Sequence, residues 1–340
     1  MLRPRVFRPV AVAAVLALAG TAAIAQTDTK PAAKEAAASQ PADARPYQLM
    51  VGDKAPPLTV EKWVKGEPIT GFEKGKVYVV EFWATWCGPC IAAMPHLTEL
   101  QKQYKDDGVT IIGMTSPDRS NTLAKVEKMV AEKGDTMGYT VAWDTERKTN
   151  EAYMRAAGQN GIPCSFVVDR EGRIAYIGHP LGLDEPLAKI VAGTYDIEKA
   201  AADYRKAREL ESKLEPLQQR LIRALQAQDW KAAKDAASEV ADLEPLTGAQ
   251  MLNYVAWTIV DPDGHVQDKD LDTALAAAER AADLTGHKDA AILDTLAMAH
   301  FLRGDTAKAI EIQTKAVELA RDSDLKAELR GRLDEFKAKK

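Results

Sequence analysis

The run Trp86-Cys87-Gly88-Pro89-Cys90 decides the fold of this chain. It follows residues 77–83, an apolar, β-branched stretch that predicts a buried strand. It precedes residues 91–94, which predict the start of a helix. This order places the first cysteine exposed at a helix N-terminus, where peptide dipoles and free N–H groups favour a thiolate. The second cysteine lies one turn further on, close enough to attack a mixed disulfide formed by the first.

A cysteine pair at this spacing also occurs as half of a zinc site. Zinc would need two more Cys or His ligands at motif spacing. The remaining cysteine is Cys164, and none of the five histidines forms a second ligand pair. We therefore favour redox chemistry and predict no metal site. We also predict no bound cofactor, because the sequence has no nicotinamide or flavin fingerprint.

The surrounding pattern alternates between strands and helices, which predicts a layered α/β domain. The strand-like segments are residues 77–83, 109–115, 165–168 and 173–178, and the helix-like segments are residues 90–104, 121–132, 149–157 and 183–192.

The strand, the Cys-Gly-Pro-Cys turn and the helix resemble the active site of the thioredoxin superfamily. They are most similar to the periplasmic TlpA/ResA-like thiol-disulfide oxidoreductases, and matching features extend over roughly residues 47–195. The resemblance implies a thioredoxin-like domain over 47–196, with a central mixed β-sheet flanked by helices. It also implies that Cys87 is the nucleophile and Cys90 the resolving thiol, and that a membrane or periplasmic donor restores the dithiol. The partners would be substrate proteins with disulfides.

Glu81 interrupts a strand that should be buried on both faces. A lone buried carboxylate is costly, so it tends to be protonated or hydrogen-bonded. Glu81 lies six residues before Cys87, where the family places a buried acid beneath the resolving cysteine. By that resemblance Glu81 shuttles the proton of Cys90, directly or through a water. An edge position that faces solvent is the alternative.

Pro163 stands just before a predicted strand, in Gly161-Ile162-Pro163. The family has a cis-proline at this place, facing the Cys-x-x-Cys and offering backbone to an extended substrate. A trans-proline that opens the strand is the alternative. By the same resemblance we expect the substrate to contact Trp86, Gly88, Pro89 and Ile162.

The direction of electron flow is less defined. Gly88-Pro89 is the dipeptide of the reducing thioredoxins, which favours a reductase over a disulfide-forming oxidase. A thiol peroxidase is a further alternative, because peroxiredoxins share the fold. Their active site resembles Pro-x-x-x-Thr-x-x-Cys, whereas Val80 and Ala84 stand at those two positions before Cys87.

Cys164 departs from the family, which usually has Thr or another small polar residue there. The sequence leaves two interpretations open. Cys164 is either a small buried residue, as free cysteines commonly are, or a third thiol that can divert the Cys87 disulfide.

The N-terminal segment predicts export. Three arginines fall within the first eight residues, residues 10–19 are apolar, and residues 23–25 fit a small-x-small cleavage site. We therefore expect a signal peptide over 1–25, a flexible linker over 26–46, and a periplasmic protein. An uncleaved membrane anchor is the alternative. The formal net charge of −5 gives no reason to expect nucleic acid as a partner.

Residues 197–340 are rich in Ala, Leu, Glu, Lys and Asp and contain no long strand-like run. Ala274 and Ala281 stand 35 residues before Ala309 and Ala316, so this part resembles tetratricopeptide (TPR) helical hairpins. A generic helical bundle is the alternative. Such hairpins form concave surfaces for partner proteins, so the chain could also serve as an adaptor with an accessory redox domain.

Overall fold

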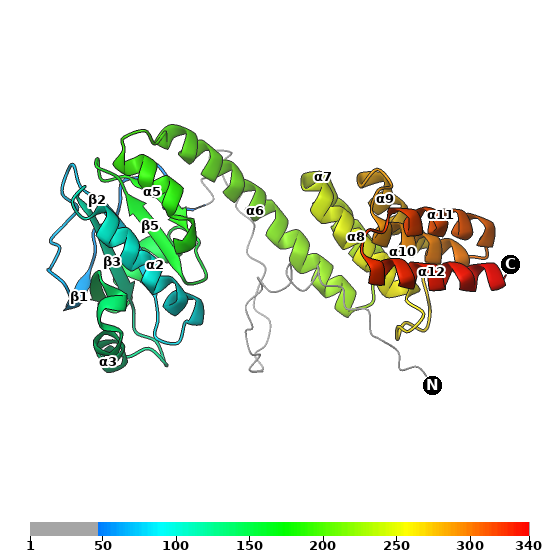
Figure 1. Cartoon of the computed structure of the whole chain (residues 1–340), viewed down its shortest axis with the longest axis horizontal. Coiled ribbons are helices and arrows are strands. Elements are labelled where there is room, and N and C mark those ends of the chain that lie inside the picture. The colour runs from blue at the N-terminus through cyan, green and yellow to red at the C-terminus, as the bar shows by residue number, and fades with distance from the viewer. Residues whose placement is uncertain (1–46, 340) are drawn as a thin grey trace, which may run out of the picture. The chain divides into compact units, whose positions relative to one another are not determined.

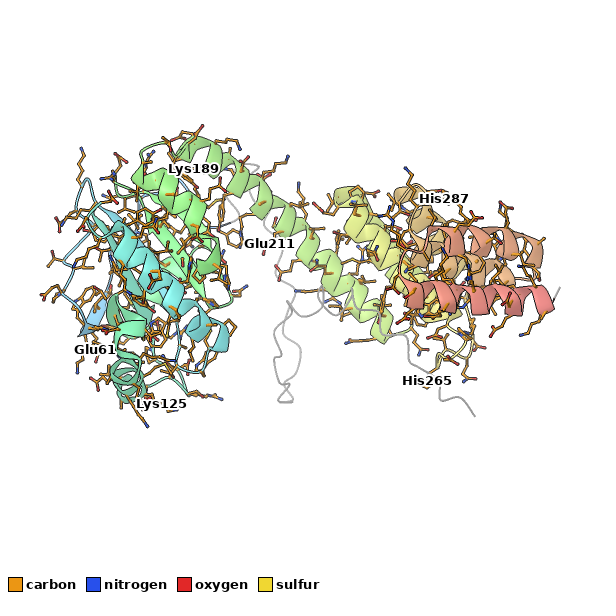
Figure 2. All side chains as sticks on the ribbon, viewed as in Figure 1. Glu61, Lys125, Lys189, Glu211, His265 and His287 are labelled. Atoms are coloured by element: carbon orange, nitrogen blue, oxygen red, sulfur yellow. A yellow bond between two sulfur atoms is a disulfide. The ribbon has the colours of Figure 1, made fainter. Side chains whose placement is uncertain are left out.

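A computed structural model describes residues 47–339 (Figure 1). The predicted signal peptide and linker lie outside these residues. Within the described part the chain divides into two compact units, a sheet unit of residues 47–209 and a helical unit of residues 210–339. Acidic and basic side chains project from the surface of the sheet unit, among them Glu61, Lys125 and Lys189 (Figure 2).

The sheet unit is built on one six-stranded mixed sheet, which confirms the predicted fold class. Its strand order is β1-β4-β3-β2-β5-β6. Strands β2, β3 and β4 run parallel, whereas β1, β5 and β6 pair antiparallel to their neighbours. The strands are β1 (Val60–Lys65), β2 (Val77–Trp83), β3 (Val109–Thr115), β4 (Thr140–Asp144), β5 (Cys164–Val168) and β6 (Ile174–Gly178).

Both faces of β2 are buried, because it lies between β3 and β5 and helices or loops cover the sheet on each side. Alternate residues therefore enter two different cores. We call the side that packs against helix α2 (Gly88–Tyr104) the α2 face, and the other side the opposite face. Val79 and Trp83 lie on the α2 face, whereas Val80 and Phe82 lie on the opposite face.

Helices α3 (Leu123–Lys133) and α5 (Asp184–Val191) also contribute to the core of the α2 face. The opposite face is covered by residues 49–58 and by a short helical segment. This segment begins as α4 (Lys148–Asn150) and continues as a π-helix, η2 (Glu151–Arg155), where the sequence predicts one helix. Two 3₁₀ turns complete the unit, η1 (Gly134–Met137) and η3 (Pro180–Gly182).

Helix α6 (Ile197–Gln226) begins in the sheet unit, although the sequence analysis set the domain boundary at residue 196/197. Ile197 and Ala201 are buried in the two cores of the sheet unit. Arg208 donates a hydrogen bond to Gly158 O at 3.1 Å and lies over the Tyr47 ring. The first turns of α6 therefore belong to the fold of the sheet unit.

The helical unit contains no strand among residues 210–339, as predicted. Consecutive helices pack on each other, and alanines with no exposed surface form much of the contact, including those at the predicted repeat positions. Gly248 allows one close crossing, since a Cβ there would lie 2.2 Å from Ala241 Cα. The remaining helices are α7 (Trp230–Leu243), α8 (Pro245–Val260), α9 (Leu271–Leu284), α10 (Ala290–Leu302), α11 (Thr306–Leu319) and α12 (Ser323–Ala338).

Between residues 47 and 339, no helix combines the length and the apolar character needed to cross a membrane.

Candidate active site

Cys87 and Cys90 are joined by a disulfide at the start of α2. Cys87 is the N-cap residue of the helix, and its sulfur accepts a hydrogen bond from Cys90 N at 3.2 Å. Pro89 occupies the first turn, where its missing N–H costs nothing. The helix N-terminus and this amide would both stabilise a thiolate on Cys87 after reduction.

The expectation of an exposed first cysteine is wrong for this disulfide form, because only 3 % of Cys87 is accessible. The Ile162 carbonyl oxygen lies 3.7 Å from its sulfur. The neighbours Trp86, Gly88 and Pro89 are exposed.

Pro163 follows a cis peptide bond with Ile162. The loop that contains this bond leads directly into β5, which pairs antiparallel with β2. The structure therefore places Ile162 and Pro163 beside the disulfide, as the family resemblance implies. A trans-proline at this position is excluded.

Glu81 is buried in the middle of β2 with 2 % of its surface exposed, which excludes the edge position. Its side chain lies on the α2 face, because Glu81 is two residues from both Val79 and Trp83, and every second residue of a strand points to the same side. Ser165 on β5 donates a hydrogen bond to Glu81 Oε2. Burial raises the pKa of Glu81 to about 8, and the Ser165 hydrogen bond limits the increase. Glu81 therefore changes charge near the pH at which a thiol does.

Cys164 is a free, buried thiol whose side chain enters the core of the opposite face. Burial raises its pKa to about 12, and the nearby Glu81 carboxylate adds to the increase. A thiol with this pKa is almost entirely protonated near neutral pH and is a weak nucleophile. The geometry therefore favours the buried, unreactive interpretation of Cys164.

A hydrogen-bonded loop that the sequence analysis missed holds the active-site turn. Trp86 Nε1 donates to Asp118 Oδ2 at 2.8 Å, although 56 % of the Trp86 surface is exposed. Asn121, fully buried, accepts hydrogen bonds from the Thr85 amide and hydroxyl. Burial raises the pKa of Asp118, but hydrogen bonds from Trp86, Ser120 and Asn121 outweigh it, and the net pKa is lowered. The only feature of the sequence that could have indicated this loop is the Asp-x-x-Asn run formed by Asp118 and Asn121, which follows a predicted strand.

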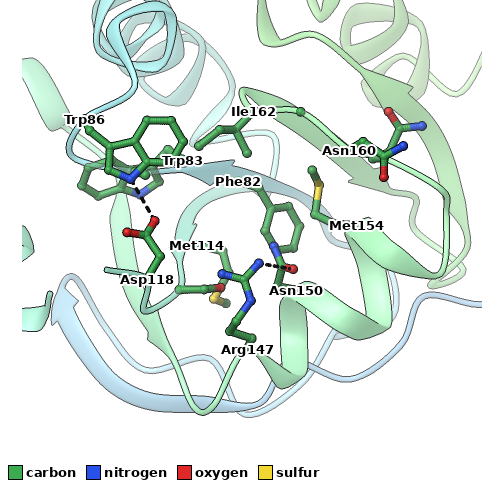
Figure 3. Close-up of a pocket in the computed structure, with 14 residues that line it drawn as sticks. Phe82, Trp83, Trp86, Met114, Asp118, Arg147, Asn150, Met154, Asn160 and Ile162 are labelled. Atoms are coloured by element: carbon green, nitrogen blue, oxygen red, sulfur yellow. Dashed lines mark hydrogen bonds between the residues drawn. The ribbon is translucent and has the colours of Figure 1, made fainter. Parts of the chain in front are cut away.

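A pocket of about 380 Å³ opens beside Trp86 and Ile162 (Figure 3). Its floor is formed by three buried side chains of the opposite face, Phe82, Met114 and Met154. Two of the polar side chains around it are held by other protein groups. Arg147 donates to Asn150 Oδ1 at 2.9 Å and to Pro117 O at 3.2 Å, and Asp118 accepts from Trp86.

The structure thus brings the eight residues expected from the sequence to one end of the sheet. Cys87, Cys90, Trp86, Gly88 and Pro89 surround the start of α2, Ile162 and Pro163 lie opposite, and Glu81 lies on the α2 face below. Among residues 47–339, no group of three or more His, Cys, Asp or Glu side chains is arranged to hold a metal ion.

Comparison with known proteins identifies relatives of this chain. Residues 50–184 match the Redoxin family model. Protein FixW of Rhizobium leguminosarum is 29 % identical over 204 residues, covering 58 % of this chain and 92 % of FixW. Thiol:disulfide interchange protein HelX of Rhodobacter capsulatus is 33 % identical over 203 residues, covering 58 % of this chain and 100 % of HelX. Thiol-disulfide oxidoreductase ResA of Bacillus thuringiensis is 33 % identical over 128 residues, covering 37 % of this chain and 68 % of ResA.

Proposed function

Because this chain belongs to the TlpA/ResA-like thiol-disulfide oxidoreductases of the thioredoxin superfamily, we propose that its Cys87–Cys90 pair reduces disulfides in other proteins, outside the cytoplasm. One observation carries the proposal. The disulfide-bonded pair begins the helix that packs on the sheet face of Glu81, a buried acid whose pKa lies near that of a thiol. The arrangement supports both the attack by one thiol and the deprotonation of the other.

The reaction begins with the reduced pair. The Cys87 thiolate attacks one sulfur of the substrate disulfide, and the other substrate sulfur leaves as a thiolate that takes up a proton. Cys90 then gives its proton to Glu81 and attacks Cys87 Sγ, which releases the second substrate thiolate. The second substrate thiolate takes up a proton from solvent, and Glu81 returns the Cys90 proton to solvent. The substrate thus gains two electrons and two protons, and Cys87–Cys90 becomes a disulfide. A donor dithiol, membrane-bound or periplasmic, must reduce it again.

Glu81 suits the deprotonation step because its pKa of about 8 is close to the ordinary thiol pKa of about 8.5. Proton transfer between groups of similar pKa costs little free energy in either direction. Glu81 lies on the sheet face that packs against α2, the helix that carries Cys90. We assign it the proton of Cys90.

The pocket next to the disulfide supports binding of an extended substrate segment. Its mouth includes Trp86 and Ile162, which flank Cys87, and its floor is apolar and rich in methionine. Methionine side chains adapt to different partners, which suits a site that receives side chains from a flexible polypeptide. A residue close to the attacked cysteine would insert its side chain here.

The helical unit is proposed to recruit a client or partner protein. Leu246, at the start of α8, is 71 % exposed, and Leu243, at the end of α7, is 37 % exposed. TPR-type hairpins commonly present such surfaces to other proteins. A chain that ends at Glu209 tests this role, because it keeps the turns of α6 that complete the sheet unit. It should reduce insulin normally and lose only the preference for its own client.

A trapping experiment tests the redox function. The Cys90→Ser variant, reduced and mixed with a protein disulfide, should accumulate a mixed disulfide at Cys87, because the resolving thiol is missing. Cys164→Ala is the matched control and should turn over like the wild type. A wild-type reduction potential near about −270 mV would support a reductase, whereas one near about −120 mV would identify an oxidase instead.

A further inference from the structure

Residues 157–162, which we call the pocket loop, connect the helical segment α4–η2 to the cis peptide bond before Pro163. Four residues of this loop line the pocket beside the disulfide (Figure 3): Gln159, Asn160, Gly161 and Ile162. The carbonyl oxygen of Ile162 lies 3.7 Å from Cys87 Sγ. The conformation of the pocket loop therefore shapes the surface that an extended substrate segment would contact.

Helix α6 holds the start of the pocket loop through Arg208. The Nη2 atom of Arg208 donates hydrogen bonds to Gly158 O at 3.1 Å and to Ala157 O at 3.4 Å. Only 8 % of Arg208 is exposed, and its guanidinium carbon lies 4.0 Å from the centre of the Tyr47 ring. Both carbonyls follow the last turn of η2, where arginine side chains commonly bind the oxygens that lack a helical partner. Because hydrogen bonds from a charged donor are the stronger class, Arg208 fixes this part of the loop.

Gly158 shows how closely two side chains approach the backbone of the loop. A Cβ at this position would lie 2.0 Å from Tyr47 Cε1 and 2.8 Å from Arg208 Nη2. The φ angle of Gly158, +63°, also lies in the left-handed region, which glycine adopts without strain. The backbone here therefore packs directly against Tyr47 and Arg208.

A second contact from α6 reaches a side chain that lines the pocket. Gln159 Nε2 donates to Tyr204 Oη at 3.3 Å and to Ala157 O at 3.4 Å. The backbone amide of Gln159 donates to the carbonyl oxygen of Met154 at 2.7 Å, and Met154 forms part of the pocket floor. Tyr204 and Arg208 are four residues apart, so they lie on the same face of α6. One face of this helix thus contacts the pocket loop at two points.

We propose that Tyr204 and Arg208 are positioning residues, which hold the pocket loop in the conformation that binds an extended substrate segment. Both belong to the sheet unit, and α6 begins after residue 184, where the match to the Redoxin family ends. A loop that is already ordered loses less conformational entropy when a polypeptide binds to it. The two residues therefore act on substrate affinity and not on thiol exchange. This effect on turnover rests on the proposed reductase function, whereas the hold of α6 on the loop does not.

Matched substitutions of two arginines test the proposal. Arg208→Met removes the hydrogen-bond donors and keeps a long side chain. Arg170→Met is the control, because Arg170 also donates to two backbone carbonyls, Gly75 O and Val191 O, and none of these three residues lines the pocket. Arg208→Met should raise KM for insulin several-fold with kcat unchanged, whereas Arg170→Met should leave KM unchanged. Reduction of bis(hydroxyethyl) disulfide, a substrate without a polypeptide chain, should be equally fast in both variants.

A smaller substitution keeps the proposal testable if Arg208→Met does not fold. Tyr204→Phe deletes only a hydroxyl and should raise KM for insulin by a smaller factor than Arg208→Met. Tyr195→Phe is its control, because the Tyr195 hydroxyl donates to Ala175 O at 2.9 Å and neither residue lines the pocket. An unchanged KM in Tyr204→Phe and in folded Arg208→Met would overturn the proposal. An equal rise of KM in the control variants would also overturn it.

Hydrogen exchange separates this proposal from the reductase function. The amides of Ala157, Gly158 and Gln159 each donate a backbone hydrogen bond, so their exchange rates report how firmly the loop is held. In the full-length, oxidised protein, Arg208→Met should speed the exchange of these amides, whereas Arg170→Met should not. Unchanged exchange in folded Arg208→Met would overturn the proposal, whatever its activity. If exchange becomes faster but the wild type does not reduce insulin, the hold of α6 on the loop stands and the reductase function fails.

Discussion

The two faces of the central sheet are both buried, but they differ in the chemistry of their side chains. The α2 face holds Glu81 with one unpaired oxygen, and it packs against the helix that carries the disulfide. The opposite face holds an aromatic cluster of Phe82, Tyr153 and Phe166, together with the inert thiol of Cys164. Alternation along one strand thus separates proton chemistry from packing by a single residue.

Under the proposed function, the opposite face also has a role at the end of the sheet. Phe82 and Met114 continue from its core into the floor of the pocket beside Trp86. The proposed function therefore puts the redox step on one face and substrate binding at the edge of the other. Four substitutions test this assignment, beginning with the largest expected effect.

Cys87→Ser should reduce the rate of disulfide reduction by about a thousandfold or more, because a serine hydroxyl cannot replace a thiolate nucleophile here. Cys164→Ala should keep the rate within about twofold and cost about 1 kcal/mol of stability, since it removes one buried atom from the opposite face. Insulin reduction and urea unfolding measure the two effects. A large loss of activity in Cys164→Ala would place a reactive thiol on both faces and break the distinction.

Glu81→Gln should slow turnover by about a hundredfold, the lower range for loss of a general acid–base group. The loss should appear in the release of the mixed disulfide, which needs the Cys90 proton removed, and not in the first attack by Cys87. Single-turnover kinetics separate the two steps. An equal slowing of both steps would point to altered Cys87 reactivity instead.

Glu81→Gln should also change how stability depends on pH. The folded carboxyl has a pKa of about 8, whereas an unfolded glutamate has one of about 4.3. Between these values the folded chain binds more protons than the unfolded chain, so wild-type stability falls as pH rises through this window. The variant lacks this fall, so its advantage should grow by up to a few kcal/mol between about pH 5 and pH 9. Urea unfolding of the two oxidised proteins measures this difference in stability. If the stabilities of the wild type and the variant depended on pH in the same way, the pKa of Glu81 would not be raised.

Among the substitutions expected to change activity, Asp118→Ala gives the smallest effect. It removes the acceptor of Trp86 Nε1 at the rim of the pocket, an interaction worth about 1 kcal/mol. We expect KM for a protein substrate to rise several-fold with little change in kcat, because Trp86 is proposed to contact substrate and to take no part in the chemistry. A decrease in kcat with KM unchanged would contradict this, because it would mean that Asp118 and Trp86 contribute to catalysis and not to substrate binding.

Much of this site follows from local sequence. Strands β2 and β3 are predictable because both of their faces are buried and most of their residues are apolar or β-branched. The two cysteines, Glu81 and Pro163 can be recognised from the sequence, because their positions relative to one another and to the predicted strands match the pattern of the family. Strand β1, an edge strand with two exposed residues in its first half, gives a weaker pattern and is not predicted, and neither is β4.

The neighbours of these residues could not be predicted, because they meet through strand register. Glu81 is opposite Gly113 on one side and Ser165 on the other, and neither pairing is encoded by distance along the chain. Asn121 reaches Thr85 across 36 residues for the same reason. The first turns of α6 were assigned to the helical unit because their helical pattern continues without a break from Ile197 to Gln226.

Competitive alkylation of the reduced, folded protein tests the central claim most directly. A limiting amount of iodoacetamide near neutral pH, followed by mass mapping, reports the thiolate character of all three cysteines at once. The account predicts rapid labelling of Cys87, slower labelling of Cys90, and labelling of Cys164 only after unfolding. Labelling of Cys164 as fast as Cys87, or a slow Cys87, would contradict the assignment of redox chemistry to the α2 face.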